Sequence, residues 1–343
     1  MWSRIWTARQ ARGCFISIGC AVVTFGLCSV SSPVRAEWTA IAEQKVSYTT
    51  NANQFSSARR LQFSDDPSLP TGIPLGNPED VIWEPSLEVI KALHPSFGQT
   101  ELSVKGHGFI FTNNPVFTHG DYRAQVRQYL GSATSVLLRY RYIPNLFLGP
   151  NLERQTGQRL IEGERVTTSK WRMEIERKFT SRLMGTLIGR YGLRTYNQPF
   201  SERDTRFWTL GPRIFYRVLP RVGAYVTALY ERGNADGAEE TQFNDDVSYR
   251  LYHLSGGVEI TISPRWLLSL AYTYQRKDFT SDLPEDTHFG RRDHLHQGLA
   301  ELGYQATARA LFTLGLQRTQ RTSTNAFRDF NDTILSLGAQ YRF

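Results

Sequence analysis

The last eleven residues of the chain, Thr333–Phe343, read TILSLGAQYRF. Every second position, counted from Thr333, is mostly apolar, and the positions between them are mostly polar. A period of two is typical of a β-strand with one apolar and one polar face. The apolar face ends on two aromatic residues, Tyr341 and Phe343, and the second is the last residue of the chain. This stretch therefore predicts an amphipathic closing strand.

Such an ending resembles the closing strand of Gram-negative outer-membrane β-barrel proteins of the porin-like family. The resemblance implies that the barrel assembly machinery reads Tyr341 and Phe343 as its recognition signal. It also implies an outer-membrane location, with membrane lipids around the barrel wall. No sequence motif in the chain indicates which substrate the protein would carry.

Residues 1–36 predict a signal peptide that is removed after export. Three arginines precede an apolar run over residues 15–28, and Val34-Arg35-Ala36 ends in a small residue, as a signal-peptidase site requires. The apolar run has about fourteen residues, short of the roughly twenty that span a bilayer as a helix. The membrane-anchor alternative is therefore disfavoured, and residues 37–343 are expected to form the mature barrel domain.

The charge and cysteine content exclude several classes of function. All 3 cysteines lie within residues 1–36, so the mature chain has no thiol for a disulfide or for catalysis. The formal net charge is +8, and removing the four arginines of that segment leaves +4. An exported, mildly basic chain does not predict a nucleic-acid partner. We expect no cofactor and no metal site.

The mature chain repeats the pattern of its last strand. Short turns such as 219–221 and 263–265, each X-Pro-Arg, alternate with long polar loops such as 233–246. The predicted strands are 45–48, 81–93, 99–111, 122–130, 135–147, 165–179, 183–196, 203–218, 222–232, 247–262, 266–277, 292–305, 309–319 and 333–343.

This layout predicts an all-β, transmembrane, antiparallel up-and-down β-barrel of 14 strands. With both termini on one side, every short turn falls on that side and every long loop on the other, as in bacterial outer-membrane barrels. The barrel must be closed, because an open sheet edge in hydrocarbon would leave backbone groups unpaired. A soluble β-sandwich is the alternative, but it has no reason to sort its loops by length.

Charged side chains in these strands must face the lumen, since a charge on the lipid face costs several kcal/mol at mid-depth. We expect the sixth strand to place Trp171 and Met173 outward and its charges inward. The inward cations form a predicted pore-lining basic arc: Arg123, Arg127, Arg139, Arg141, Lys170, Arg172, Lys178, Arg190, Arg194, Arg213 and Arg217. The predicted pore-lining acidic residues are Glu84, Glu88, Glu101, Glu231, Glu259 and Glu301.

These two arcs favour a passive or weakly selective pore for small polar, possibly anionic, solutes, because opposed charges at a constriction select permeating ions. One alternative is that the charges pair and fill a closed lumen. A second is a secretion or assembly component of the polysaccharide-export or lipoprotein-translocation type. A third is a hydrolase at the outer rim that uses Asp245, Asp246, Asp293 and His294. The pore interpretation predicts no enzymatic activity.

Overall fold

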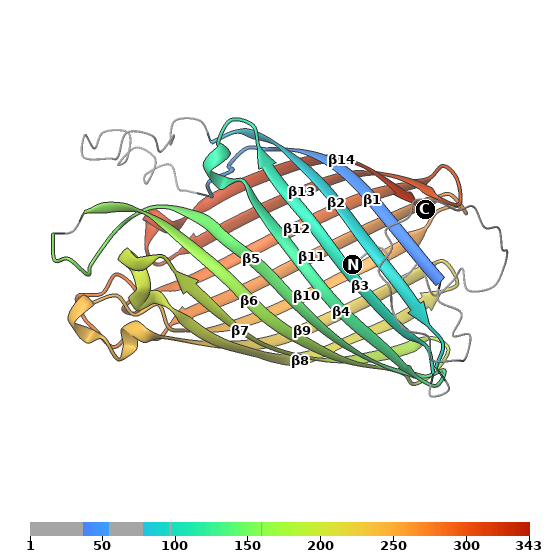
Figure 1. The fold of residues 1–343 in the computed structure, drawn as a ribbon, viewed down its shortest axis with the longest axis horizontal. Coiled ribbons are helices and arrows are strands. Elements are labelled where there is room, and N and C mark those ends of the chain that lie inside the picture. Colours follow the sequence, from blue (N-terminus) through green and yellow to red (C-terminus); the bar gives the residue numbers. More distant parts are fainter. Residues whose placement is uncertain (1–36, 55–77, 96–97, 159) are drawn as a thin grey trace, which may run out of the picture. The chain divides into compact units, whose positions relative to one another are not determined.

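The structure is a computed structural model that describes residues 37–54, 78–95, 98–158 and 160–343. The predicted signal peptide, 1–36, lies outside the described residues. The described chain forms a closed antiparallel barrel of fourteen strands (Figure 1). This confirms the predicted fold class and strand number.

The strands run obliquely across the barrel and are long enough for a tilted membrane crossing (Figure 1). They are β1 (Glu37–Thr49), β2 (Asp80–Leu93), β3 (Thr100–Phe111), β4 (His119–Leu130), β5 (Thr134–Leu152), β6 (Ile161–Lys178), β7 (Leu183–Tyr196), β8 (Thr205–Leu219), β9 (Val222–Ala235), β10 (Tyr249–Thr261), β11 (Trp266–Phe279), β12 (Arg292–Gln305), β13 (Ala310–Ser323) and β14 (Phe330–Arg342).

The barrel closes by pairing its first strand with its last. Each strand otherwise pairs with its neighbours in the sequence, and β1 pairs with β14 in a register that sets Val46 opposite Leu337. The backbone amide of Phe343 donates a hydrogen bond to the carbonyl of Ala40 at 2.9 Å. Leu337 and Phe343 are the most exposed large hydrophobic residues of the closing segment, at 64% and 67%, which places the apolar face of the closing strand on the outer wall.

Short and long connections lie at opposite ends of the barrel. The connections 131–133, 179–182, 220–221, 262–265 and 306–309 are at the end that carries the C-terminus (Figure 1). The connections at the other end are longer, and several of them contain short 3-10 helices, namely η1 (Pro115–Phe117), η2 (Gln198–Arg203), η3 (Asp236–Ala238), η4 (Thr241–Phe243) and η5 (Ala326–Arg328). None of the helices in the described residues is long and apolar enough to cross a membrane.

The strands β5 and β6 extend further than the sequence predicted. The predicted loop over 149–163 is partly paired, because β5 continues to Leu152 and β6 begins at Ile161. Two register shifts in this pair fall next to Asn145 and Gly149, which have positive φ angles of 49° and 117°. A glycine in a strand often marks such a bulge. The prediction was wrong here because Gly149 and Pro150 were interpreted as loop residues.

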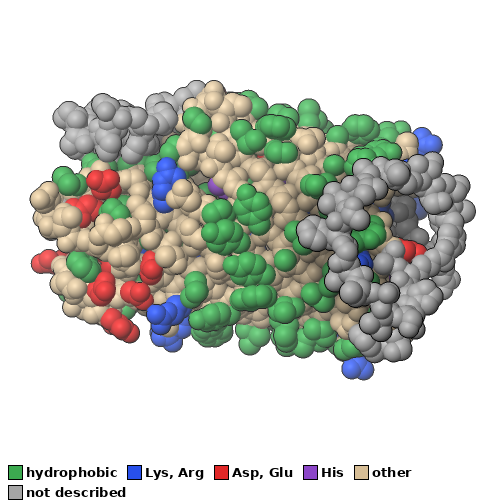
Figure 2. Space-filling view, viewed as in Figure 1, with side chains coloured by type: hydrophobic (Ala, Val, Ile, Leu, Met, Phe, Trp, Pro, Cys, Tyr) green, Lys and Arg blue, Asp and Glu red, His purple; other side chains and the backbone are tan. Residues whose placement is uncertain are grey.

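The outer wall is apolar over the middle of the strands, and charges such as those of Arg206, Arg232 and Arg250 lie on it near the strand ends. On β6, Trp171 and Met173 are half exposed whereas Glu174 is 6% exposed. Figure 2 shows hydrophobic side chains over the visible middle of the barrel and acidic side chains gathered at the end with the long loops. This arrangement agrees with the predicted alternation of lipid-facing and lumen-facing residues.

Candidate functional site

Six cationic side chains from four adjacent strands, β4 to β7, line a cavity of about 260 Å³. All six lie away from the ends of their strands and on the face opposite the outer wall. We call this set the cationic ladder: Arg123, Arg139, Arg141, Lys170, Arg172 and Arg190.

The strand register sets the ladder residues in two rows. In the first row Arg123 of β4 lies opposite Arg141 of β5, which lies opposite Lys170 of β6. The carboxylate of Asp121 contacts two of these cations, accepting from Nη2 of Arg123 at 2.6 Å and from Nε of Arg141 at 2.8 Å. Asp121 was not among the predicted residues, although it lies two positions before Arg123 on the same face of its strand.

The second row runs from Arg139 to Arg172 and on to Arg190, again with each residue directly opposite the next. Arg172 contacts the carboxylate of Glu174 at 2.7 Å, and Arg139 donates a hydrogen bond to Gln125 at 3.0 Å. Like charges directly opposite each other destabilise a sheet. The stability of the sheet therefore does not explain why the cations of these two rows lie opposite one another.

The ladder carries more positive than negative charge. Its cations contact the carboxylates of Asp121 and Glu174. Neither Lys170 nor Arg190 makes a hydrogen bond or an ion pair with any residue that the structure describes, and Nε of Arg190 is buried without a partner. Low-dielectric walls around such a charge excess concentrate the field in the space between them.

The remaining cations of the predicted basic arc lie outside the ladder. Three of them donate hydrogen bonds to hydroxyl groups on other strands: Arg127, Arg194 and Arg213. Lys178 and Arg217 are exposed near the short turns. The predicted arc is therefore not uniform, and the strand register brings together only six of its eleven members.

The predicted acidic residues do not form one opposing surface. Glu231 lies on the basic side, where its Oε1 is 3.4 Å from Nη2 of Arg194 and accepts a hydrogen bond from Tyr249. Glu84 is neutralised by Lys45 at 2.7 Å. Thus the pair of opposed arcs expected from the sequence is replaced by a cationic ladder and several separate acids.

The other four predicted acids have weaker polar contacts. Glu88 accepts a hydrogen bond from Ser103, and Glu101 accepts one from Tyr129. Glu259 and Glu301 form no hydrogen bond or ion pair within the part of the chain that the structure describes. These acids contribute negative charge to the lumen but no common binding geometry.

The residues of the rim-hydrolase alternative are not arranged as that chemistry requires. Asp293 is buried and bound by Arg291, whereas Nδ1 of His294 contacts the hydroxyl of Tyr274 at 2.8 Å. Adjacent residues of a strand point to opposite faces. Asp293 therefore does not orient His294 as a general base. Asp245 and Asp246 are both buried in loop contacts.

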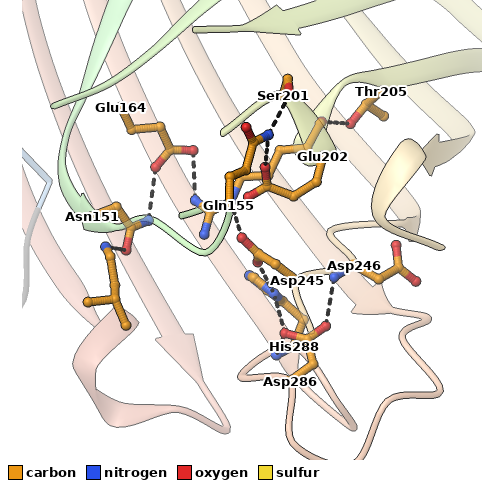
Figure 3. Close-up of polar contacts among 12 residues, drawn as sticks. Asn151, Gln155, Glu164, Ser201, Glu202, Thr205, Asp245, Asp246, Asp286 and His288 are labelled. Carbon is orange, nitrogen blue, oxygen red and sulfur yellow. Dashed lines mark hydrogen bonds and ion pairs between the residues drawn. The ribbon is translucent and has the colours of Figure 1, made fainter. Parts of the chain in front are cut away.

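A second group of charged residues lies among the long loops. We call it the loop cluster, and its members are at most 6% exposed: Glu202, Arg203, Asp245, Asp286 and His288. They come from the connections β7–β8, β9–β10 and β11–β12, and Figure 3 shows Asp245, Asp286 and His288 close together. Asp245 is the one member of the cluster that was predicted from the sequence, although the two-residue spacing of Asp286 and His288 also indicates side chains on one side of a loop.

Contacts within the loop cluster join all three connections. Oδ2 of Asp245 accepts a hydrogen bond from Nε of Arg203 at 2.7 Å. Nδ1 of His288 is 2.9 Å from Oδ1 of Asp286 and 3.4 Å from Oδ1 of Asp245. Arg203 also contacts Glu164 at 2.9 Å. The single guanidinium is thus shared between two carboxylates.

The carboxyl groups of the cluster differ in their proton affinity. Burial by itself would raise the pKa of Asp245, but the charge of Arg203 and the contact with His288 hold that pKa well below its usual range. Burial, and to a smaller extent the neighbouring charge of Asp245, raise the pKa of Glu202 to about 7. Oε1 of Glu202 is buried and has no hydrogen-bond partner in the described residues.

No known protein family and no curated protein matches this sequence. Its structure is similar to the crystal structure of the outer membrane channel DcaP of Acinetobacter baumannii, at 12% identity over 92% of this chain and 100% of that chain, with a TM-score of 0.54. It is also similar to a loop-deletion mutant of OmpT, an outer membrane protein of Vibrio cholerae, at 8% identity over 91% and 100% of the two chains, with a TM-score of 0.51.

These similarities concern the fold. Together with the closed barrel of fourteen strands, they confirm that the chain has the porin-like fold of outer-membrane β-barrel proteins.

Proposed function

We propose that this protein is a passive, weakly selective outer-membrane pore that favours small anionic solutes. The observation that carries the proposal is the cationic ladder, in which six cations surround a cavity of about 260 Å³ and lie in rows directly opposite one another. An arrangement that opposes like charges costs stability. Attraction of anions by the positive field of the ladder would explain why these like charges are kept despite their cost in stability.

The contacts of the ladder suit transient anion binding. Lys170 and Arg190, which have no hydrogen bond or ion pair among the described residues, offer N–H donors to a passing solute. An arginine can bind a carboxylate or a phosphate through two parallel hydrogen bonds. Conduction needs several weak sites in succession, so that an ion that binds can also leave. Two rows of cations provide such a succession.

The location and partners follow from the same interpretation. We propose that the signal peptide directs export, that the barrel assembly machinery recognises the strand ending in Tyr341 and Phe343, and that the long loops face the outside of the cell. The proposed pore needs no cofactor and catalyses no reaction.

Ion selectivity in planar bilayers tests the proposal. Across a potassium chloride gradient, we expect the reversal potential of the folded protein to show a preference for chloride. The double variant Lys170→Gln/Arg190→Gln should lose most of this preference, because it removes the two cations without protein partners. Arg217→Gln, which removes an exposed charge near a short turn, is the matched control and should behave as the wild type. Absence of conductance in folded protein, or a preference for potassium, would overturn the proposal.

A further inference from the structure

Five arginines lie on the outer wall of the barrel, near the end that carries the long loops. They come from five adjacent strands, β8 to β12. On β8, Arg206 shares its strand face with Trp208 and Leu210, whose exposed side chains belong to the apolar wall. We call this set the arginine belt: Arg206, Arg232, Arg250, Arg276 and Arg292.

A row of aromatic side chains accompanies the belt on the side toward the middle of the barrel. On each of the strands β8 to β11, the aromatic residue lies two positions from the arginine and on the same face: Trp208, Tyr230, Tyr252 and Tyr274. The ring centroids of Trp208 and Tyr230 are 5.4 Å apart, and those of Tyr230 and Tyr252 are also 5.4 Å apart. Aromatic girdles mark the boundary between hydrocarbon and headgroups around a membrane barrel. The belt therefore lies at the level of the lipid headgroups.

The belt carries an excess of positive charge. Oδ1 of Asp278 accepts a hydrogen bond from Nε of Arg276 at 2.9 Å and another from Nε of Arg292 at 2.8 Å. Arg232 and Arg250 lie directly opposite each other on neighbouring strands, an arrangement that destabilises a sheet. Five arginines and one aspartate give this group a formal net charge of +4. The stability of the wall does not explain this excess.

The belt is confined to one part of the wall. On β1, β2 and β4, the outward side chains near the same end of the barrel are uncharged and exposed, namely Tyr48, Val81 and Tyr122. A ring of cations around the whole barrel would suit a general attraction to the membrane surface. A group on adjacent strands instead indicates a local binding surface.

We propose that the arginine belt binds the phosphate groups of anionic lipid headgroups, in the leaflet on the side of the long loops. A guanidinium can donate two parallel hydrogen bonds to a phosphate. The aromatic row and the apolar wall adjoin the belt, so a lipid whose phosphate is bound there lays its acyl chains along this wall. A free phosphate ion would gain nothing from that apolar surface. The inference takes the apolar wall as lipid-facing and does not depend on conduction by the barrel.

Quenching of tryptophan fluorescence by brominated lipids tests the proposal, because Trp208 lies next to the belt. One form of the protein keeps Trp208 as its only tryptophan in residues 37–343, and a second form keeps only Trp83, with phenylalanine at the other tryptophan positions. Both residues are exposed, and each is the fourth residue of its strand. The Trp83 form is therefore a matched control on a strand outside the belt.

The two forms are folded into vesicles of dioleoylphosphatidylcholine that contain either brominated phosphatidic acid or the same fraction of brominated phosphatidylcholine. From the quenching of Trp208, we expect phosphatidic acid to bind several-fold more strongly than phosphatidylcholine. At Trp83 we expect the two lipids to quench equally.

Two double variants of the Trp208 form separate the belt from net charge. Arg232→Gln/Arg250→Gln should make the two lipids quench equally. Arg177→Gln/Arg221→Gln removes the same charge from exposed positions near the short turns and should keep the preference for phosphatidic acid.

Three results would overturn the proposal: equal quenching of Trp208 by the two lipids, the same preference at Trp83, or an equal loss of preference in both double variants. If the single-tryptophan forms do not fold, native mass spectrometry of the protein with all its tryptophans decides the question. After extraction from vesicles with equal fractions of the two lipids, the wild type should retain phosphatidic acid several-fold more often than phosphatidylcholine. Equal retention would contradict a phosphate-binding belt.

Discussion

The cationic ladder and the loop cluster both contain arginines, but the arginines of the two regions have different partners. In the ladder, cations lie directly opposite cations, and Arg190 has no ionic partner in the described part of the barrel. In the loop cluster, Arg203 lies between Glu164 and Asp245 and is 6% exposed. A charge that is fully paired holds a structure together, whereas a charge without a protein partner remains available to a solute.

Both regions depend on a closed wall, so deletion of Phe343 should have the largest effect. This exposed aromatic residue directly follows β14, and its backbone amide donates a hydrogen bond to Ala40 of β1. We expect a large reduction of folded protein in the outer membrane, measured by immunoblotting of membrane fractions. The control variant is Phe343→Tyr, which keeps an aromatic residue at the end of the chain. Normal amounts of the deletion variant would contradict the proposed assembly signal.

Charge reversal in the ladder should have the next largest effect, on conduction alone. Lys170→Glu places a carboxylate among five arginines and reduces the positive field in the cavity. We expect the ratio of chloride to potassium permeability to fall several-fold in reversal-potential measurements. Lys178→Glu, at an exposed position near a short turn, is the control. An equal decrease in both variants would show that net charge, and not the ladder, sets the selectivity.

Removal of one arginine from each region compares them directly. Arg203→Gln leaves two buried carboxylates without their cation, and breaking a buried ion pair in this way costs about 3–5 kcal/mol. Arg190→Gln removes a cation that faces another cation, so stability should be unchanged or slightly higher. Hydrogen exchange of the outer loops and urea unfolding of the two variants provide the measurement. Equal destabilisation by both would remove the distinction between the regions.

The loop 153–160 offers a smaller, pH-dependent test, because there a carboxylate is held without a cation. The hydroxyl and the backbone amide of Thr156, together with the amide of Leu160, donate hydrogen bonds to Glu153 and keep its pKa below the usual 4.5. Because the folded-state pKa is lowered, the stabilisation is present above pH 4.5 and is lost as the pH falls through the folded value.

Hydrogen exchange of this loop as a function of pH is the measurement. After correction for the intrinsic rate, exchange should accelerate below pH 4.5 in the wild type. In Glu153→Gln it should be faster at neutral pH and show no such transition. A wild-type loop whose protection is independent of pH would contradict the role assigned to Glu153.

The features that were predicted correctly from the sequence are those that depend on neighbouring residues in the chain. The period of two in Thr333–Phe343 and in the other strands fixes which side chains share a face, and hydrocarbon cannot accept an open sheet edge. The strand number, the closure near Val46 and the outward position of Trp171 follow from these two facts. The extended pair β5 and β6 was missed because a glycine at a bulge and a glycine in a loop look alike in sequence.

The sequence by itself determined that the protein is a closed barrel with an apolar outer wall and inward-facing charges. Only the tertiary structure decided which charges meet. The register of β4 to β7 selects six cations from the predicted arc, and Glu231 lies beside Arg194 instead of across from it. Two separate connections, β9–β10 and β11–β12, bring Asp245 to His288. Alternation along a strand is a local property, whereas register and loop packing depend on contacts between residues far apart in the chain.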